Sequence, residues 1–188
     1  MPTLTVVAGP NGSGKSTLTS SIWFGGNENL VDPDAIARVL NSAAPAEAAI
    51  PAARETILRC RRLLGKRESF TRETTLAGNG AMGILRRATV AGYVTNLVYV
   101  SLGNPELHIE RVRVRVSVGG HDIADTDIRR RYWRSLARAP EALRLVDSAT
   151  VMDNSGSRPV LLLLFERGRL LWQAEALPEW VRGLVGKP

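Results

Sequence analysis

The chain has one cysteine, few aromatic residues and no long apolar run, and each shortage excludes a class of protein. The single cysteine, Cys60, has no partner among the 188 residues, so an internal disulfide is excluded. No apolar stretch reaches the roughly eighteen residues of a membrane-spanning helix, and the N-terminus lacks the pattern of a signal peptide. We therefore expect a cytoplasmic protein with no membrane partner.

The scarcity of aromatic residues also bears on the excess of positive charge. The formal net charge is +7, and much of it lies between Arg111 and Arg138. A nucleic-acid-binding surface usually combines basic side chains with exposed aromatic rings on which bases stack. Only Tyr132 and Trp133 could serve in this stretch, and their helical pattern predicts that both pack against the protein. The charge therefore favours the phosphates of small molecules over nucleic acid as the partner.

A glycine-rich loop follows the first apolar segment directly and has the spacing of a phosphate-binding loop, or P-loop. Its backbone N–H groups can converge on phosphate oxygens, and the helix that begins near Lys15 adds its positive end. In this pattern Lys15 reaches the β- and γ-phosphates, and the Ser16 hydroxyl is the expected ligand of Mg²⁺. The predicted nucleotide-binding residues are Gly9, Pro10, Asn11, Gly12, Ser13, Gly14, Lys15, Ser16 and Thr17.

Apolar segments alternate with helical patterns along the rest of the chain. Strands are predicted at residues 4–8, 28–31, 69–75, 95–102, 150–153, 160–166 and 169–175. Helices are predicted at residues 16–23, 34–41, 52–64, 78–91, 105–118, 125–136 and 178–185, and residues 139–146 continue the helix of residues 125–136 or form another. This alternation predicts an α/β protein with a three-layer P-loop NTPase or kinase fold and a mostly parallel central sheet.

We expect one domain over residues 1–188, with a helical lid at about residues 105–136. The C-terminal part, residues 150–188, is predicted to hold a strand, a hairpin that adds an antiparallel edge to the sheet, and a short helix. Asp153-Asn154-Ser155, at the end of one of these strands, is a candidate for the region near the nucleotide base.

Two acidic residues follow predicted strands, where the ligands of a parallel sheet collect. Asp34 could accept the proton of a hydroxyl that attacks the γ-phosphate, although Asp34 or Asp32 could equally serve as a helix cap. Glu73 could bind substrate hydroxyls or act on Mg²⁺ through water, and its alternative is a local ion pair with Arg72. The positions alone leave both alternatives open.

The predicted lid is rich in arginine, the residue that neutralises charge on a transferred phosphoryl group. Arg111, Arg113 and Arg115 alternate with valines, which is the period of a strand, but the flanking sequence favours a helix. The same catalytic role could fall to an arginine of the segment 129–131.

Taken in order, these motifs resemble the zeta-toxin-like P-loop kinases, and most closely their short, stand-alone bacterial branch. The resemblance spans about residues 4–156. Beyond the loop it rests on Asp32-Pro33-Asp34-Ala35-Ile36-Ala37, Glu73-Thr74-Thr75-Leu76, Ala91-Gly92-Tyr93, Arg111-Val112, Arg115-Val116, Gly119-Gly120-His121, Arg130-Arg131-Tyr132 and Asp153-Asn154-Ser155.

The resemblance implies the roles of individual residues. Zeta toxins phosphorylate the 3′-hydroxyl of the sugar in UDP-N-acetylglucosamine, with ATP or GTP and Mg²⁺. By this likeness Asp34 is the general base, Glu73 and the adjacent Thr74 bind substrate, and Arg111 is a catalytic lid arginine. The second lid arginine has no clean match, so Arg115, His121 and Arg130 remain candidates for it, and His121 is a further candidate for contact with the substrate. An antitoxin, if one exists, is a separate protein.

The leading hypothesis is therefore an ATP- or GTP-dependent kinase that transfers the γ-phosphate to a hydroxyl of a small molecule. The alternative is a P-loop ATPase or nucleotide switch that acts with a nucleic-acid or protein partner. The third strand lacks four apolar residues ending in aspartate, the usual Walker B pattern, and this counts against the alternative. A module that binds nucleotide without turnover is the third possibility.

Overall fold

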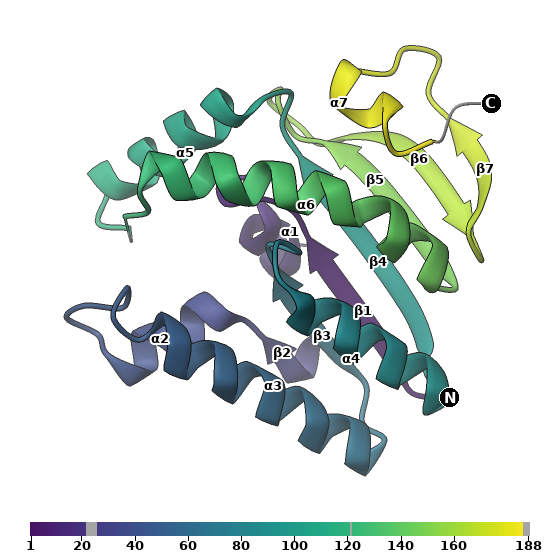
Figure 1. Cartoon of the computed structure of the whole chain (residues 1–188), viewed down its shortest axis with the longest axis horizontal. Coiled ribbons are helices and arrows are strands. Elements are labelled where there is room, and N and C mark those ends of the chain that lie inside the picture. Colours follow the sequence, from purple (N-terminus) through teal and green to yellow (C-terminus); the bar gives the residue numbers. More distant parts are fainter. Residues whose placement is uncertain (22–25, 121, 186–188) are drawn as a thin grey trace.

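Within the described part of the chain, seven strands form one sheet in the order β2-β3-β1-β4-β5-β6-β7 (Figure 1). The structure is a computed structural model and describes residues 1–21, 26–120 and 122–185. The first five strands pair in parallel, whereas β6 and β7 continue the sheet as an antiparallel hairpin. The strands are β1 (Thr3–Ala8), β2 (Leu30–Val31), β3 (Phe70–Thr74), β4 (Val94–Ser101), β5 (Ser148–Asp153), β6 (Val160–Glu166) and β7 (Arg169–Gln173).

Helices lie on both faces of this sheet. They are α1 (Lys15–Ser21), α2 (Pro33–Leu40), α3 (Ala49–Lys66), α4 (Asn79–Val90), α5 (Pro105–Ser117), α6 (Asp125–Leu145) and α7 (Glu179–Arg182). Alternate residues of β1, Leu4, Val6 and Ala8, join the main apolar core with α3, α4 and α6, while α1 lies behind the sheet in Figure 1. The three-layer α/β fold with a mostly parallel sheet is thus confirmed.

The expected second strand is shorter than predicted. Of residues 28–31, only Leu30 and Val31 pair with β3, because Asn27–Asn29 form a 3-10 turn after Gly26. The last two residues of the helix predicted at 16–23 lie outside the described part of the chain, as does His121.

Two helices contain prolines that bear on the predicted helix bounds. Helix α3 begins at Ala49, before the predicted start at residue 52. Pro51 lies in its first turn, where backbone N–H groups have no partner within the helix, so the missing N–H of proline costs no hydrogen bond. Helix α6 continues through Pro140, so residues 139–145 extend the helix predicted at 125–136, which is one of the two alternatives left open by the sequence. Ala139, Ala142 and Leu143 are buried on either side of this proline. Their packing offsets the roughly 3 kcal/mol that an interior proline costs a helix.

Helices α5 and α6 cover the region predicted as a lid, and they are called the lid below; they share a small apolar core of their own. Ile109 and Val112 of α5 pack there against Ile128 of α6, apart from the main core. The lid therefore has internal packing that holds its two helices together above the P-loop. None of the helices in the described ranges is long and apolar enough to cross a membrane.

Candidate active site

The phosphate-binding loop joins β1, a central strand of the sheet, to α1. The Gly9 N–H donates to the Thr74 carbonyl at the end of β3, so the loop starts between two strand ends. Gly12 has φ +75°, and a Cβ at this position would lie 2.7 Å from the backbone oxygen of His108 in α5. Only glycine combines this backbone conformation with so close an approach. The glycine spacing therefore serves the packing of the loop against α5 as well as the convergence of its amides.

Lys15 stands at the first position of α1 with its side chain under the loop. Its Nζ donates to the Pro10 carbonyl at 2.9 Å. Burial lowers the pKa of Lys15, and the nearby carboxylates of Glu73 and Asp34 oppose this shift. A buried ammonium beside converging amides is suited to phosphate oxygens, which would accept the hydrogen bond now made to Pro10.

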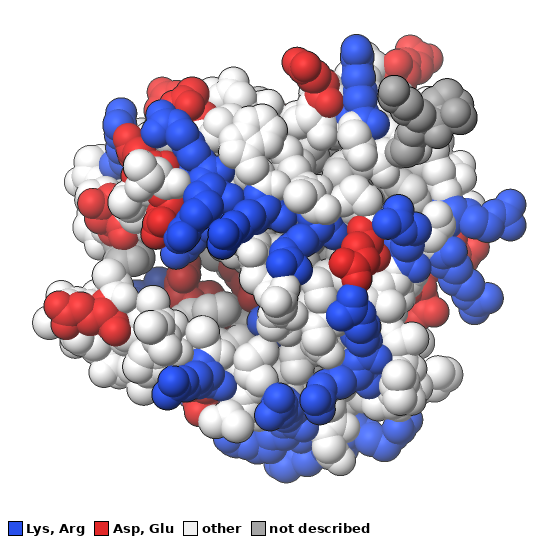
Figure 2. Space-filling view, in the orientation of Figure 1, with Lys and Arg blue, Asp and Glu red and all other residues white. Residues whose placement is uncertain are grey.

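One cavity of about 1050 Å³ brings most of the predicted site residues together. Figure 2 shows a recess on this side of the molecule, with basic side chains along its upper rim over the lid. The cavity volume is at the upper end for ligand pockets and suits two substrates. The predicted residues that line it are Asn11, Gly12, Gly14, Lys15, Ser16, Thr17, Asp34, Glu73, Arg111 and Arg115.

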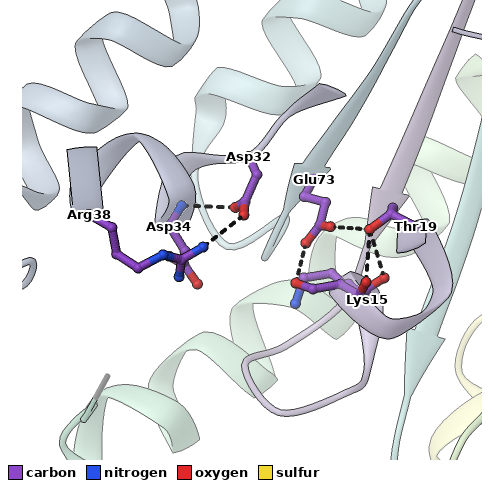
Figure 3. Close-up of polar contacts among 7 residues, drawn as sticks. Lys15, Thr19, Asp32, Asp34, Arg38 and Glu73 are labelled. Atoms are coloured by element: carbon purple, nitrogen blue, oxygen red, sulfur yellow. Dashed lines mark hydrogen bonds and ion pairs between the residues drawn. The ribbon is translucent and has the colours of Figure 1, made fainter. Parts of the chain in front are cut away.

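Glu73 faces α1 and not its neighbour in the sequence. Its Oε2 accepts from the Ser16 hydroxyl at 2.9 Å and its Oε1 accepts from the Thr19 hydroxyl (Figure 3). Arg72 points to the opposite face of β3 and donates to the Gly80 carbonyl, because successive residues of a strand alternate. The alternative of an Arg72–Glu73 ion pair is therefore wrong. Burial raises the pKa of Glu73, and the hydrogen bond from Thr19 partly opposes this rise.

The two aspartates at the start of α2 have different surroundings. Asp32 is the N-cap, whose carboxylate accepts from the Asp34 N–H and lies 3.8 Å from Arg38 (Figure 3). Asp34 lies within the first turn and lines the cavity. Helix capping is thus met by Asp32, which leaves the Asp34 carboxylate for the cavity.

The lid arginines separate by helical period. Arg111 and Arg115 are four residues apart in α5 and both line the cavity, whereas Arg113 points away and pairs with Asp125. The helical interpretation of this segment is therefore confirmed. Arg111 also donates to the Asn154 carbonyl at 2.6 Å, which ties the lid to the loop after β5.

Two further predicted site residues, Arg130 and Thr74, do not line the cavity. Arg130 pairs with Asp127 on the exposed side of α6, while the next residue, Arg131, donates to Asn11 Oδ1 in the P-loop at 3.2 Å. The hydroxyl of Thr74 accepts from the Leu76 N–H and so closes a turn. His121, the remaining candidate, lies outside the described residues.

The region predicted to lie near the base forms one wall of the cavity. Residues 154–159, between β5 and β6, line it, and the Asn154 amide donates to the Ser13 carbonyl. In the sheet order β5 and β2, the strand before Asp34, lie on either side of β1. Asp153, just before residues 154–159, accepts from the indole N–H of Trp180 in α7. The C-terminal helix thereby braces this wall.

The sequence analysis gave no role to His108, which joins the P-loop to the rest of the protein. Its Nδ1 donates to the Asn11 carbonyl at 2.7 Å, and its Nε2 accepts from the Leu102 N–H at 3.2 Å. Only the neutral ring can make both contacts, and burial accordingly lowers the pKa of His108 to about 4. No sequence motif marks this histidine, because its partners are remote in sequence.

The packing of the two aromatic residues in α6 was predicted correctly for only one of them. Tyr132 is buried and stacks edge-on against His108, whereas Trp133 is 61% exposed. The prediction that Trp133 packs against the protein is therefore wrong, because its side chain lies on the surface of the basic helix α6.

The donor set of the site fits Mg²⁺ bound together with a nucleotide. No cluster of three or more His, Cys, Asp or Glu side chains that could hold a metal occurs in the part of the chain that the structure describes. The Ser16 hydroxyl and the Glu73 carboxylate are hard oxygen donors that lie together beside the loop. Mg²⁺ commonly binds in this manner, with one or two protein oxygens, substrate phosphates and water.

Comparison with known proteins adds one relative in sequence and several in fold. An uncharacterized protein of Haemophilus influenzae is 34% identical over 128 residues, which cover 66% of this chain and 88% of that protein. No family model matches the chain.

Two solved structures share the fold at low identity. One belongs to the PezAT chromosomal toxin-antitoxin system of Streptococcus pneumoniae; it is 14% identical, with a TM-score of 0.61 over 85% of this chain and 70% of that one. The other is the crystal structure of AvrRxo1-ORF1:-ORF2 with ATP, 14% identical, with a TM-score of 0.65 over 90% of this chain. This chain spans only 60% of the AvrRxo1 chain that it matches.

Proposed function

Since the chain belongs to the family of the Haemophilus influenzae protein and has the fold of the zeta-toxin-like P-loop kinases, we propose that it is a nucleotide-dependent kinase. It would transfer the γ-phosphate of ATP or GTP to a hydroxyl of a small molecule. The observation that carries this proposal is the cavity in which the P-loop, Asp34, Glu73 and the lid arginines meet.

The P-loop half of the cavity holds the phosphates in this proposal. The loop amides and Lys15 bind the phosphate oxygens, and Ser16 supplies the protein ligand of Mg²⁺. A bound Mg²⁺ would neutralise negative charge on the β- and γ-phosphates. The base would lie toward residues 154–159, which line the cavity after β5.

Asp34 acts as the general base in this scheme. As the acceptor oxygen attacks the γ-phosphorus, the hydroxyl proton passes to the Asp34 carboxylate and the bond from phosphorus to the β-phosphate oxygen breaks. Arg115 and Arg111 reach the cavity from the lid, where they can stabilise the charge of the transferred group. Arg130 is left out of the proposal because it faces away from the cavity and pairs with Asp127.

ATP turnover measured across a panel of hydroxylated acceptors, with UDP-N-acetylglucosamine first, tests this proposal. Asp34→Asn should reduce kcat by about 10²-fold or more while ATP binding persists, because the amide cannot accept the proton. Arg115→Ala should lower kcat by a similar factor, and Arg130→Ala serves as the matched arginine control with little change.

Turnover that is independent of every acceptor would instead favour an ATPase or switch.

A separate inhibitor protein is a further part of the proposal. The two structural neighbours come from a toxin-antitoxin system and from a two-protein complex. Copurification of a second protein encoded beside this one, with loss of ATP turnover in the complex, would support an antitoxin.

A further inference from the structure

We propose that Thr19 is a positioning residue that holds Glu73 against Ser16, so that Glu73 serves the metal side of the site and not the acceptor. This inference rests on the proposed kinase function, because it assigns the Mg²⁺ environment of the same site. The family resemblance, by contrast, implies that Glu73 binds substrate.

The inference starts from the position of Thr19 on α1. Thr19 lies one helical turn after Lys15 and Ser16 and is 7% exposed. Its hydroxyl oxygen is 3.3 Å from the Lys15 carbonyl and 3.2 Å from the Ser16 carbonyl, and it is closer still to Glu73 Oε1. A hydroxyl has one proton, and a carboxylate accepts it more strongly than a backbone carbonyl does. The Thr19 proton is therefore directed at Glu73.

Both carboxylate oxygens of Glu73 consequently face α1. Oε1 accepts from Thr19 and Oε2 accepts from Ser16, so two hydroxyls of one helix fix the orientation of the carboxylate (Figure 3). Asp34, the residue proposed to meet the acceptor hydroxyl, lines the same cavity but comes from a different element, α2. The orientation of Glu73 thus places it with the P-loop and its phosphates.

This arrangement also prepares Ser16 for a metal ion. Because the Ser16 proton is donated to Glu73, the lone pairs of the serine oxygen stay available for coordination. A protein group that orients a metal ligand in this way commonly contributes 10- to 100-fold to metal affinity. Thr19 contributes through Glu73, since it keeps the carboxylate turned toward the Ser16 hydroxyl.

The test compares ATP affinity with Mg²⁺ and with EDTA by calorimetry, and the ratio of the two dissociation constants defines the Mg²⁺ enhancement. Thr19→Val keeps the size of the side chain but removes the hydroxyl, and it should reduce this enhancement about 10-fold. ATP affinity in EDTA should stay within about twofold of the wild type. Thr19→Ser, which retains the hydroxyl, should restore the enhancement, and Thr19→Ala replaces Thr19→Val if the latter does not fold.

Ser20→Ala is the matched control. Ser20 is an exposed hydroxyl on the same helix that bonds only the Thr17 carbonyl among the described residues, so its loss should leave the enhancement unchanged. Binding of Mn²⁺ to the ATP complex, followed by electron paramagnetic resonance, supplies a readout independent of turnover and should weaken in Thr19→Val to the same degree.

The outcomes separate the inference from the function on which it rests. Full Mg²⁺ enhancement in Thr19→Val, or an equal loss of ATP affinity with and without Mg²⁺, overturns the positioning role alone. Wild-type protein that binds no nucleoside triphosphate under either condition overturns the proposed kinase function. A selective loss in Thr19→Val, restored by serine, supports both.

Discussion

His108 connects the P-loop to the end of β4. Its ring joins the Asn11 carbonyl of the loop to the Leu102 N–H beyond the end of β4, and Tyr132 packs against it. A proton added to Nε2 would face the Leu102 N–H, so that one hydrogen bond would be replaced by repulsion between two donors. The chain therefore folds around the neutral form of this histidine.

A specific dependence of stability on pH follows from this requirement. The pKa of His108 falls from 6.5, its ordinary value, to about 4 in the folded chain, so the unfolded chain binds the proton more readily. The stability that His108 contributes is complete above pH 6.5 and is lost as the pH falls toward 4. We expect the free energy of unfolding in urea to decrease by about 2–3 kcal/mol between pH 7 and pH 4.5 from this group.

His108→Asn isolates this contribution from that of the carboxylates. Asparagine can donate to the Asn11 carbonyl but does not titrate. The free energy of unfolding of the variant should therefore decrease by about 2–3 kcal/mol less than that of the wild type over the same pH interval. Equal pH dependence in the variant and the wild type would contradict the assignment.

At the scale of the elements, a glycine of α4 has space for a side chain and a glycine of the P-loop does not. Gly83 lies in the interior of α4, where an added Cβ would have no atom within 4 Å, whereas a Cβ on Gly12 would meet the His108 carbonyl. Gly83→Ala should therefore stabilise the chain by about 0.5–1 kcal/mol in urea unfolding, because alanine favours the helix. Gly12→Ala should destabilise it by about 1–3 kcal/mol and weaken ATP binding. Stabilisation by both substitutions would show that the loop does not pack as described.

The elements also show what the sequence could and could not predict. The alternation of apolar and helical segments was sufficient for the parallel sheet, the P-loop and the antiparallel hairpin, because these depend on local periodicity and glycine spacing. Whether residues 139–146 continue the helix before them could not be decided, because the packing that offsets Pro140 comes from distant residues. Glu73 and Asp34 were located at strand ends, but their partners could not be assigned until the fold placed Thr19, Ser16 and Asp32 beside them.

For the whole molecule, nucleotide binding should be visible as thermal stabilisation. Binding to the folded state at 100 times the dissociation constant adds about 2.7 kcal/mol. For a chain of 188 residues this corresponds to a rise in Tm of about 5–10 °C, measurable by differential scanning fluorimetry. AMP lacks the β- and γ-phosphates that Lys15 is expected to bind, so it should raise Tm much less at the same concentration. Equal shifts with AMP and Mg·ATP would argue against the assigned orientation of the triphosphate.

The bond between Trp180 and Asp153 gives the molecule an intrinsic optical signal. The indole is 8% exposed, packs near Tyr99 and donates to Asp153 at 2.7 Å, immediately before the loop that walls the cavity. A ligand that shifts this loop will change the polarity and the quenching that the indole experiences. Its fluorescence can therefore follow occupancy of the cavity without a label. Because the chain has four tryptophans, the part of the signal change that Trp180→Phe removes is the part that Trp180 reports.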